Sequence, residues 1–137
     1  MRQKLYTIIC AVLLAVFLSA CGGKVDGGNV DGVKTHQVDS KIYSQEEISA
    51  AICTIENEIK RSWKGCTLTE IYYAGDERNA QFQQWRDAEE VIVLLSSFDV
   101  DSSGGDGSLN PDSAYDNWNW ILVRTDGGEW RHIDHGY

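Results

Sequence analysis

An acidic, glycine-rich stretch over residues 99–110 has the residue types of a calcium-binding loop. Asp99, Asp101 and Ser103 fall at its first, third and fifth positions, where calcium loops place oxygen ligands, and Gly104 follows where they turn sharply. Asn110 stands at the last position, where a bidentate glutamate is expected, and no second helix is indicated after it. The stretch is also rich in turn-forming residues, as a long hairpin loop is. We favour the hairpin loop and keep Asp99, Asp101 and Ser103 as candidate calcium ligands.

The motif His132-Ile133-Asp134-His135 could bind a metal ion or orient an imidazole for acid–base chemistry. Side chains on a strand alternate between its two faces, so His132 and Asp134 would share one face and are the candidate zinc ligands. A third ligand would have to come from elsewhere, and His36 lies in a glycine-rich segment that places it poorly. We favour a polar face at the end of the last strand. The sequence assigns neither catalytic residues nor a cofactor.

Cys53 and Cys66 are the two cysteines of the part expected to fold as a domain, and an even number of exported cysteines often indicates a disulfide. A helix from Cys53 to about Lys64 would span about 16 Å. A disulfide requires Cα atoms about 4.4–6.8 Å apart. The bridge is therefore possible only if the helix ends early. We expect two separate, buried thiols and no disulfide.

Aromatic residues are numerous and could line a cavity for a small apolar or sugar-like ligand. The set comprises Trp63, Tyr72, Tyr73, Phe82, Trp85, Trp118, Trp120 and Trp130. Trp118 and Trp120 would share one face of a strand, whereas Tyr72 and Tyr73 would point to opposite faces. Because an ordinary core also needs aromatic residues, we favour a role in the core for most of them.

The N-terminal 20 residues are typical of an export signal. Arg2 and Lys4 precede an apolar run that begins at Leu5, and the run is shorter than the roughly 20 residues that a membrane-spanning helix needs. Leu18-Ser19-Ala20-Cys21 matches the lipobox of bacterial lipoproteins, in which the cysteine receives a diacylglyceryl thioether and becomes the new N-terminus. We therefore predict a signal peptide over 1–20 and a lipid anchor on Cys21.

Residues 21–41 are dominated by glycine and small polar residues and have no regular spacing of apolar ones. This composition predicts a flexible linker that carries a single domain over 42–137. The chain has a formal net charge of −9, and removal of the signal peptide takes away only positive charge. Such a charge argues against nucleic acid as a partner.

The domain is expected to begin with a helix. Ser44 and Glu47 form a capping box, Tyr43 and Ile48 are spaced as a hydrophobic staple, and Gly65 can end the helix. The apolar residues of this segment recur at steps of three and four. They are Ile48, Ile52, Ile55, Ile59 and Trp63.

Four segments after the helix have the composition of strands. They are Thr67–Tyr73, Val91–Val100, Trp118–Arg124 and Glu129–Ile133, and Ala80–Arg86 between the first two is either a short helical turn or irregular. Consecutive strands joined by hairpins form an antiparallel sheet. We therefore predict an α+β fold in which the N-terminal helix packs on a curved antiparallel sheet of about four strands.

The order of these segments resembles a family of small, uncharacterised lipoproteins of Firmicutes. The stretches that carry the resemblance are Tyr43, Glu47-Ile48, Ala50-Ala51, Gly65-Cys66-Thr67-Leu68, Ile71-x-Tyr73, Val91-Ile92-Val93-Leu94-x-Ser96-x-Phe98, Trp118-x-Trp120-Ile121-Leu122-Val123-Arg124 and Trp130…Gly136-Tyr137. The resemblance implies a cystatin-like, nuclear transport factor 2-like fold. It carries over no catalytic residues, and this group of folds includes enzymes as well as binding modules.

The sequence predicts a non-enzymatic module that binds a ligand or a protein at the outer face of the cytoplasmic membrane, attached through Cys21. Two alternatives stay open. One is an immunity-type protein whose acidic surface binds a cationic toxin or peptide, and the other is an isomerase or lyase with its site in the cone of the fold.

Overall fold

A computed structural model describes residues 27–86 and 89–137 of the chain. The signal peptide and the lipidation site predicted at Cys21 lie outside the described residues. Within those ranges, no helix is long and apolar enough to cross a membrane.

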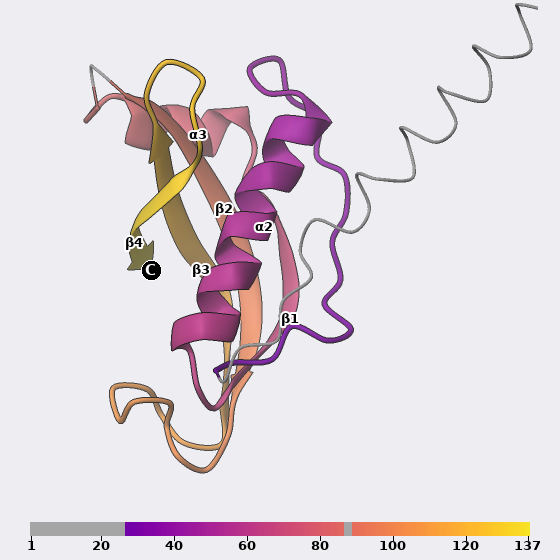
Figure 1. The fold of residues 1–137 in the computed structure, drawn as a ribbon, viewed down its shortest axis with the longest axis vertical. Helices are drawn as coiled ribbons and strands as arrows, with labels where there is room; N and C mark the ends of the chain where they lie inside the picture. Colours follow the sequence, from indigo (N-terminus) through magenta and orange to yellow (C-terminus); the bar gives the residue numbers. More distant parts are fainter. Residues whose placement is uncertain (1–26, 87–88) are drawn as a thin grey trace, which may run out of the picture.

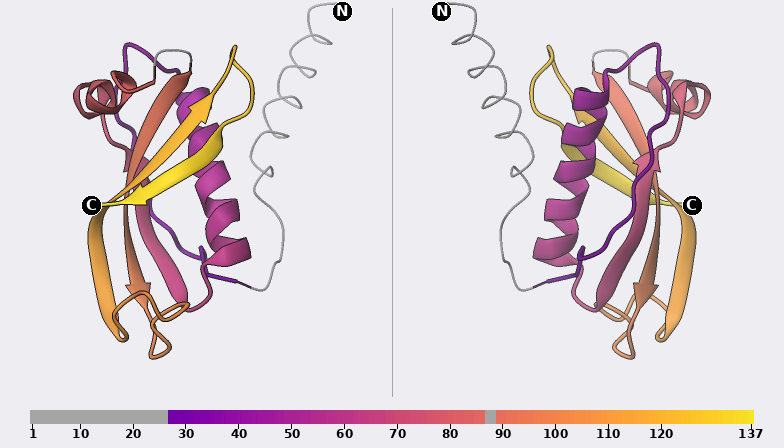
Figure 2. Two further views of the ribbon diagram at one scale, coloured as in Figure 1. Left: turned by 90° about the vertical axis from the view of Figure 1, so that its left-hand side faces the viewer. Right: turned by 90° about the vertical axis from the view of Figure 1, so that its right-hand side faces the viewer.

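The described chain forms a four-stranded antiparallel sheet with one long helix across a face, which confirms the predicted α+β class (Figure 1). The elements are α2 (Gln45–Ser62), β1 (Cys66–Tyr73), α3 (Asp76–Gln83), β2 (Glu90–Val100), β3 (Ser113–Arg124) and β4 (Arg131–Gly136). The strands lie in the order β1-β2-β3-β4, so each strand pairs with its neighbour in sequence. The sheet curves around α2, as the side views in Figure 2 show.

The signals that predicted α2 are present in the structure. The Ser44 side chain accepts a hydrogen bond from the Glu47 N–H, and the Glu47 carboxylate accepts one from the Ser44 N–H. At the other end Gly65 has φ of +81°, the left-handed conformation that the sequence analysis expected there.

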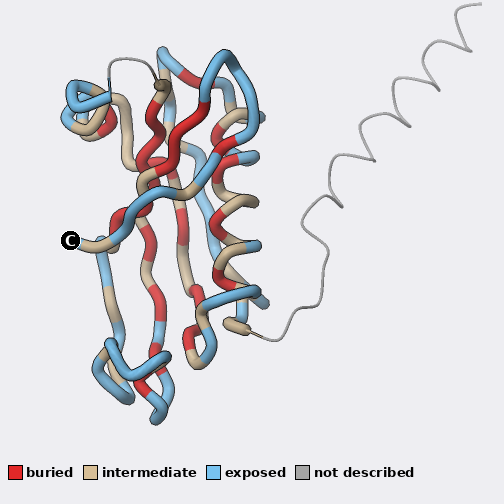
Figure 3. The backbone as a smooth tube through the Cα atoms, turned by 60° about the vertical axis from the view of Figure 1, so that its left-hand side comes forward, coloured by how far each residue is buried: buried red, intermediate tan, exposed pale blue. Residues whose placement is uncertain are grey.

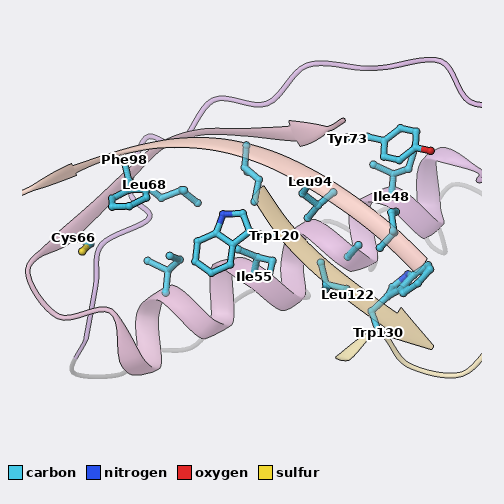
Figure 4. Packing of buried hydrophobic residues seen from close by; sticks show 14 of the residues in the cluster. Ile48, Ile55, Cys66, Leu68, Tyr73, Leu94, Phe98, Trp120, Leu122 and Trp130 are labelled. Atoms are coloured by element: carbon cyan, nitrogen blue, oxygen red, sulfur yellow. The ribbon is translucent and has the colours of Figure 1, made fainter. Parts of the chain in front are cut away.

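The core lies between α2 and the concave face of the sheet (Figures 3 and 4). The helix contributes Ile48, Ala51, Ile55 and Ile59, and the sheet contributes residues that include Leu68, Ile71, Leu94, Phe98, Trp120 and Leu122. The period-three-and-four stripe of α2 therefore covers the alternating inward positions of the strands. Burial of this apolar area is the main stabilising term of the fold.

The short helix α3 covers part of the opposite, convex face, over Val91, Val93 and Val123. It is held there by Asn79, which is buried: its side-chain amide donates to the Val91 carbonyl, and its side-chain oxygen accepts from the Val93 N–H. The sequence left residues 80–86 undecided between a helical turn and an irregular connection, and the helix begins earlier, at Asp76.

β-Bulges interrupt the register of all three strand pairs: one lies at Thr69 in β1, and the other two lie in β3 and β4. Ser96 pairs with Trp118 and Phe98 pairs with Tyr115, so β3 has an extra residue where Asn117 adopts φ of +55°. Leu122 pairs with His132 and Ile121 pairs with Asp134, so β4 has an extra residue at Ile133. Bulges bend a strand locally, and these accompany the curvature of the sheet.

Residues 27–41, which the sequence analysis assigned to a flexible linker, lie against the folded domain along the edge of β1. Asn29 and Lys34 form parallel bridges with Thr67 and Glu70, and four backbone hydrogen bonds of 2.8–3.0 Å join them to β1. The linker prediction is therefore wrong for residues 27–41, and the folded unit begins before Ile42.

The glycines that suggested a linker are needed for close packing. The Gly28 N–H donates to the Ile59 carbonyl at 2.8 Å, next to the last turn of α2. A Cβ on Gly27 would lie 1.9 Å from the Lys60 carbonyl oxygen, and one on Gly28 would lie 2.6 Å from the Trp63 carbonyl oxygen. A glycine-rich composition alone does not distinguish a flexible segment from one whose backbone packs closely against another element.

Candidate functional site

An open groove of about 590 Å³ lies where the C-terminal end of α2, the β2–β3 loop and strands β3 and β4 meet. We call it the aromatic groove. Its lining residues are Ser62, Trp63, Lys64, Cys66, Gly105, Asp106, Ser108, Leu109, Trp118 and His135. This volume is in the range of small-molecule binding sites.

Three aromatic side chains form the walls of the groove. Trp63 is the C-cap residue of α2, and its ring centroid lies 5.0 Å from that of His135 and 6.3 Å from that of Trp118. The Trp118 and His135 rings are stacked, with centroids 5.9 Å apart. Trp63 and Trp118 both belong to the aromatic set identified in the sequence, and the fold brings them together from the C-cap of α2 and from β3. Trp120, on the same face of β3 as Trp118, belongs to the core below the groove and is fully buried.

The bulge at Ile133 determines which residues of β4 face the groove. On a regular strand His132 would share its face with Asp134, but the extra residue reverses the alternation beyond the bulge. As a result, His132 and His135 both pack on Trp120, with centroids 5.2 and 5.3 Å away, and His132 Nε2 lies 3.2 Å from His135 Nδ1. His132 and Asp134, the candidate zinc ligands, therefore do not share a face as expected. His132 contacts His135 instead.

The environment of His132 favours its neutral form. Burial and, after it, the neighbouring His135 lower the pKa of His132 below its ordinary value, while Glu58 and Asp134 act in the opposite direction. A neutral imidazole can donate one hydrogen bond and accept another. The histidine pair can therefore share one hydrogen between its two facing nitrogen atoms.

The indole nitrogens of Trp118 and Trp120 differ in their partners. Trp120 Nε1 donates to Ser96 Oγ at 2.7 Å. Trp118 Nε1 is shielded from solvent and has no hydrogen-bond partner among the described residues. A buried donor without an acceptor costs about 1–3 kcal/mol.

The β2–β3 loop supplies the polar rim of the groove. Asp106 accepts hydrogen bonds from both the backbone N–H and the hydroxyl of Ser108, which fixes the turn that presents both residues. The hydroxyl of Ser108 is the main cause that lowers the pKa of Asp106, so its carboxylate is ionised at neutral pH. Lys64 and Ser62 contribute further exposed polar groups from the other side.

The calcium candidates do not converge in the way that a calcium loop requires. Asp99 lies in β2 and Asp101 follows it, and both line a separate hollow of about 340 Å³ that Ser103 does not line. The Asp101 carboxylate accepts hydrogen bonds from the N–H and the hydroxyl of Ser103, so it stabilises a turn. Within the described residues, no three or more His, Cys, Asp or Glu side chains are arranged to hold a metal ion. The structure contains the hairpin loop that we favoured for residues 99–110, and it runs from the end of β2 at Val100 to the start of β3 at Ser113.

The cysteines Cys53 and Cys66 are not bridged to each other, because Cys66 is a free, buried thiol. Burial is the main cause that raises the pKa of the Cys66 thiol to about 11, with Asp101 and Asp106 adding to it. Cys66 therefore lines the groove as a protonated thiol at neutral pH. Cys53 is disulfide-bonded, so the expectation of two free thiols and no disulfide is wrong for Cys53.

The opposite end of α2 meets the sheet through a cluster of charged and aromatic side chains, which we call the arginine cluster. Arg124 donates to Glu90 and Glu47 at 2.8 Å each, and its guanidinium lies 4.4 Å from the Trp130 ring centroid. The hydrogen bond from Arg124 is the largest cause that lowers the pKa of Glu47. Tyr43 completes the cluster, with its hydroxyl donating to the Val91 carbonyl at 2.7 Å. Its side chains bind one another, so this end is structural.

Comparisons with known proteins give no match: no family model, no curated protein and no solved structure matches this chain. The resemblance to lipoproteins of Firmicutes therefore stays a prediction.

Sequence reasoning missed the contribution of the β2–β3 loop to the groove. Asp106, Ser108 and Leu109 were considered only as parts of a possible calcium loop or as turn formers. The signal available was the repeat of Asp-x-Ser at 101–103 and 106–108, which builds two successive turns and folds the loop back toward α2.

Proposed function

We propose that this protein is a non-enzymatic binding module, attached to the outer face of the cytoplasmic membrane by a lipid on Cys21, and that it binds a small ring-shaped ligand in the aromatic groove. The ligand is aromatic or sugar-like. Neither a nucleic acid nor a cofactor is part of the proposal.

The observation that carries the proposal is the contrast between the walls and the rim of the groove. Trp63 and Trp118 offer flat apolar rings and His135 a flat polar one, while Asp106 and Ser108 offer hydrogen-bonding groups at the edge. A ligand with a flat ring and polar substituents would match this groove. Its apolar faces would pack on the walls, and the hydroxyl, carbonyl or amino groups on its edge would hydrogen-bond to the rim.

The proposal of a lipid anchor is supported by the lipobox Leu18-Ser19-Ala20-Cys21. Two or three acyl chains on one cysteine give stable attachment, because each buried methylene contributes about 0.8 kcal/mol. Intact-mass measurement of the chain from a bacterial membrane fraction tests this part. The expected result is an N-terminus at Cys21 with the added mass of the lipid, and an unmodified chain that starts elsewhere would contradict it.

Thermal unfolding of the chain from residue 21, with Cys21→Ala to keep it unanchored, tests the groove. The panel contains aromatic metabolites and simple sugars. A ligand at 100 times its dissociation constant adds about 2.7 kcal/mol to the free energy of unfolding, which is easily seen as a raised Tm.

The matched variants are His135→Ala in the groove and His36→Ala on the N-terminal segment, both at exposed histidines. A binding shift that is lost in His135→Ala and kept in His36→Ala supports the proposal. A shift that both variants keep would place the ligand elsewhere.

A further inference from the structure

The segment between the proposed anchor and the folded domain is much shorter than the sequence suggested. A free linker from Cys21 to Ile42 would reach about 70 Å. Since residues 27–41 lie along β1, only six residue steps lead from Cys21 to Gly27. That length spans at most about 20 Å when fully extended.

The point at which this tether meets the domain is fixed and adjoins the groove. Gly27 and Gly28 pack against the last turn of α2, which continues directly into Ser62, Trp63 and Lys64 of the groove lining. Cys66 lines both the groove and the hollow that Gly27 lines. Figure 1 shows the start of the described N-terminal segment (indigo), the end of α2 and the β2–β3 loop at the same, lower end of the molecule, with α3 at the other end.

The charges at the groove point to a ligand without net charge. Lys64 and Asp106 supply one ammonium and one carboxylate to the rim, which balance each other. The chain as a whole has a net charge of −9, which repels anionic headgroups. A sugar ring is neutral, has an apolar C–H face for Trp63 and Trp118, and has hydroxyl groups for the rim.

From these three observations we infer that the groove is held at the bilayer surface and binds a neutral, sugar-bearing headgroup of a membrane lipid. The inference rests on the proposed anchor and groove and adds their relative position and the source of the ligand. The short tether keeps the groove within reach of headgroups and raises their effective concentration there.

The first experiment measures which end of the anchored protein is near the bilayer. The lipidated chain carries 5-fluorotryptophan and is placed in phosphatidylcholine nanodiscs that contain a headgroup-level nitroxide lipid. The fluorine signals of Trp63 and Trp118 are expected to broaden more than that of Trp85, which is 78% exposed and follows α3 at the opposite end. Trp85→Phe assigns the control signal.

Lengthening the tether supplies the matched comparison. A Gly-Ser spacer of about 20 residues, inserted between Cys21 and Gly27, has an r.m.s. length of roughly 25 Å and is expected to remove the difference between the two ends. Equal broadening of Trp85 and Trp63 before the insertion would overturn the inferred position.

The second experiment tests the ligand. Nanodiscs of phosphatidylcholine with a minor fraction of monogalactosyl diacylglycerol are expected to shift the Trp63 and Trp118 signals, and His135→Ala is expected to lose the shift. Phosphatidylglycerol in place of the galactolipid is expected to give none. A shift with phosphatidylglycerol alone, or none with the galactolipid, would overturn the inferred ligand.

Binding of methyl galactoside to the unanchored Cys21→Ala chain tests the proposed function of the groove separately from its inferred position at the bilayer. If the free sugar binds in the groove but the anchored groove lies away from the bilayer, the proposed binding function stands and this inference fails. If the groove lies at the bilayer but no ring-shaped compound binds in it, the proposed groove function fails as well.

Discussion

The two ends of α2 meet the sheet in contrasting ways, although both are rich in aromatic residues. At the N-terminal end Tyr43 and Trp130 pack on Arg124, and its guanidinium donates to two carboxylates. At the C-terminal end Trp63 and Trp118 border an open groove, and the Trp118 indole N–H has no partner among the described residues. At the N-terminal end of α2 the charged groups fill the space between the aromatic rings. At the C-terminal end the β2–β3 loop lies beside the rings without filling that space, and the aromatic groove remains open.

This difference assigns a role to each end. Satisfied polar networks stabilise a structure and hold it in one arrangement, whereas a buried donor without a partner is costly and is rare in native structures. We therefore expect substitutions in the arginine cluster to change stability most and substitutions in the groove to change it less.

The largest effect is expected from Arg124→Met. The variant leaves Glu47 and Glu90 without their shared donor and Trp130 without its cation, so the free energy of unfolding should fall by about 2–4 kcal/mol. Urea denaturation of the chain from residue 21 measures it. Arg131→Met is the control, because Arg131 pairs with Glu89 with its side chain 61% exposed and should cost about 0–1 kcal/mol. Equal losses in the two variants would contradict a structural role for the cluster.

The next effect compares the two indole nitrogens. Trp120→Phe removes the donor to Ser96 and should cost about 1–3 kcal/mol more than Trp118→Phe, which removes a donor without a partner. Trp120 is fully buried and Trp118 only partly, so Trp120→Phe is also measured in a Ser96→Ala background, and the double-mutant cycle separates the hydrogen bond from the loss of packing. If Trp118→Phe proves the more costly, the groove end is as well satisfied as the arginine cluster.

An effect of similar size is expected where the N-terminal segment packs against the end of α2. Gly28→Ala places a methyl group 2.6 Å from the Trp63 carbonyl oxygen and should cost about 1–3 kcal/mol through overpacking. It should also make residues 27–41 easier to cleave in limited proteolysis. Gln37→Ala, at an exposed position of the same segment, should stay within about 0.5 kcal/mol of the native chain. An unchanged cleavage rate in Gly28→Ala would show that the glycine is not required for docking.

The smallest effect concerns His132 and pH. Because the folded state lowers the pKa of His132, the unfolded chain binds its proton more readily, and stability should decrease as the pH falls from neutral through the folded pKa. Each unit of pKa difference contributes about 1.4 kcal/mol. His132→Gln should remove this part of the pH dependence between about pH 8 and pH 5, and His36→Gln should keep it. A steeper dependence in His132→Gln would contradict the direction of the shift.

Much of the fold could be predicted from the sequence because its signals are local. The capping box at Ser44 and Glu47, the apolar stripe of α2 and the β-branched run of β2 each agree with the structure. The start of β3 was predicted five residues late, because Asp116 and Asn117 interrupt the apolar pattern at the bulge.

The site could be predicted only in part, because it depends on contacts between distant residues. Trp63 and Trp118 were named from their type, but nothing local indicates that α2 ends beside β3. Likewise, the pairing of His132 with His135 depends on one extra residue at Ile133, which pleat alternation does not include.

The pairing of residues 29–34 with β1 also bears on the solubility of shortened forms of the protein. The segment satisfies four backbone groups of β1, at Cys66, Leu68, Thr69 and Ile71, and its Val30, Val33 and Val38 pack against the core. A chain cut at Ile42 would leave that edge open on a strand whose threonine, leucine and isoleucine side chains suit pairing with another chain. Such a fragment would self-associate through β1, so aggregation of the shortened protein would report a lost edge cover and not an unstable core.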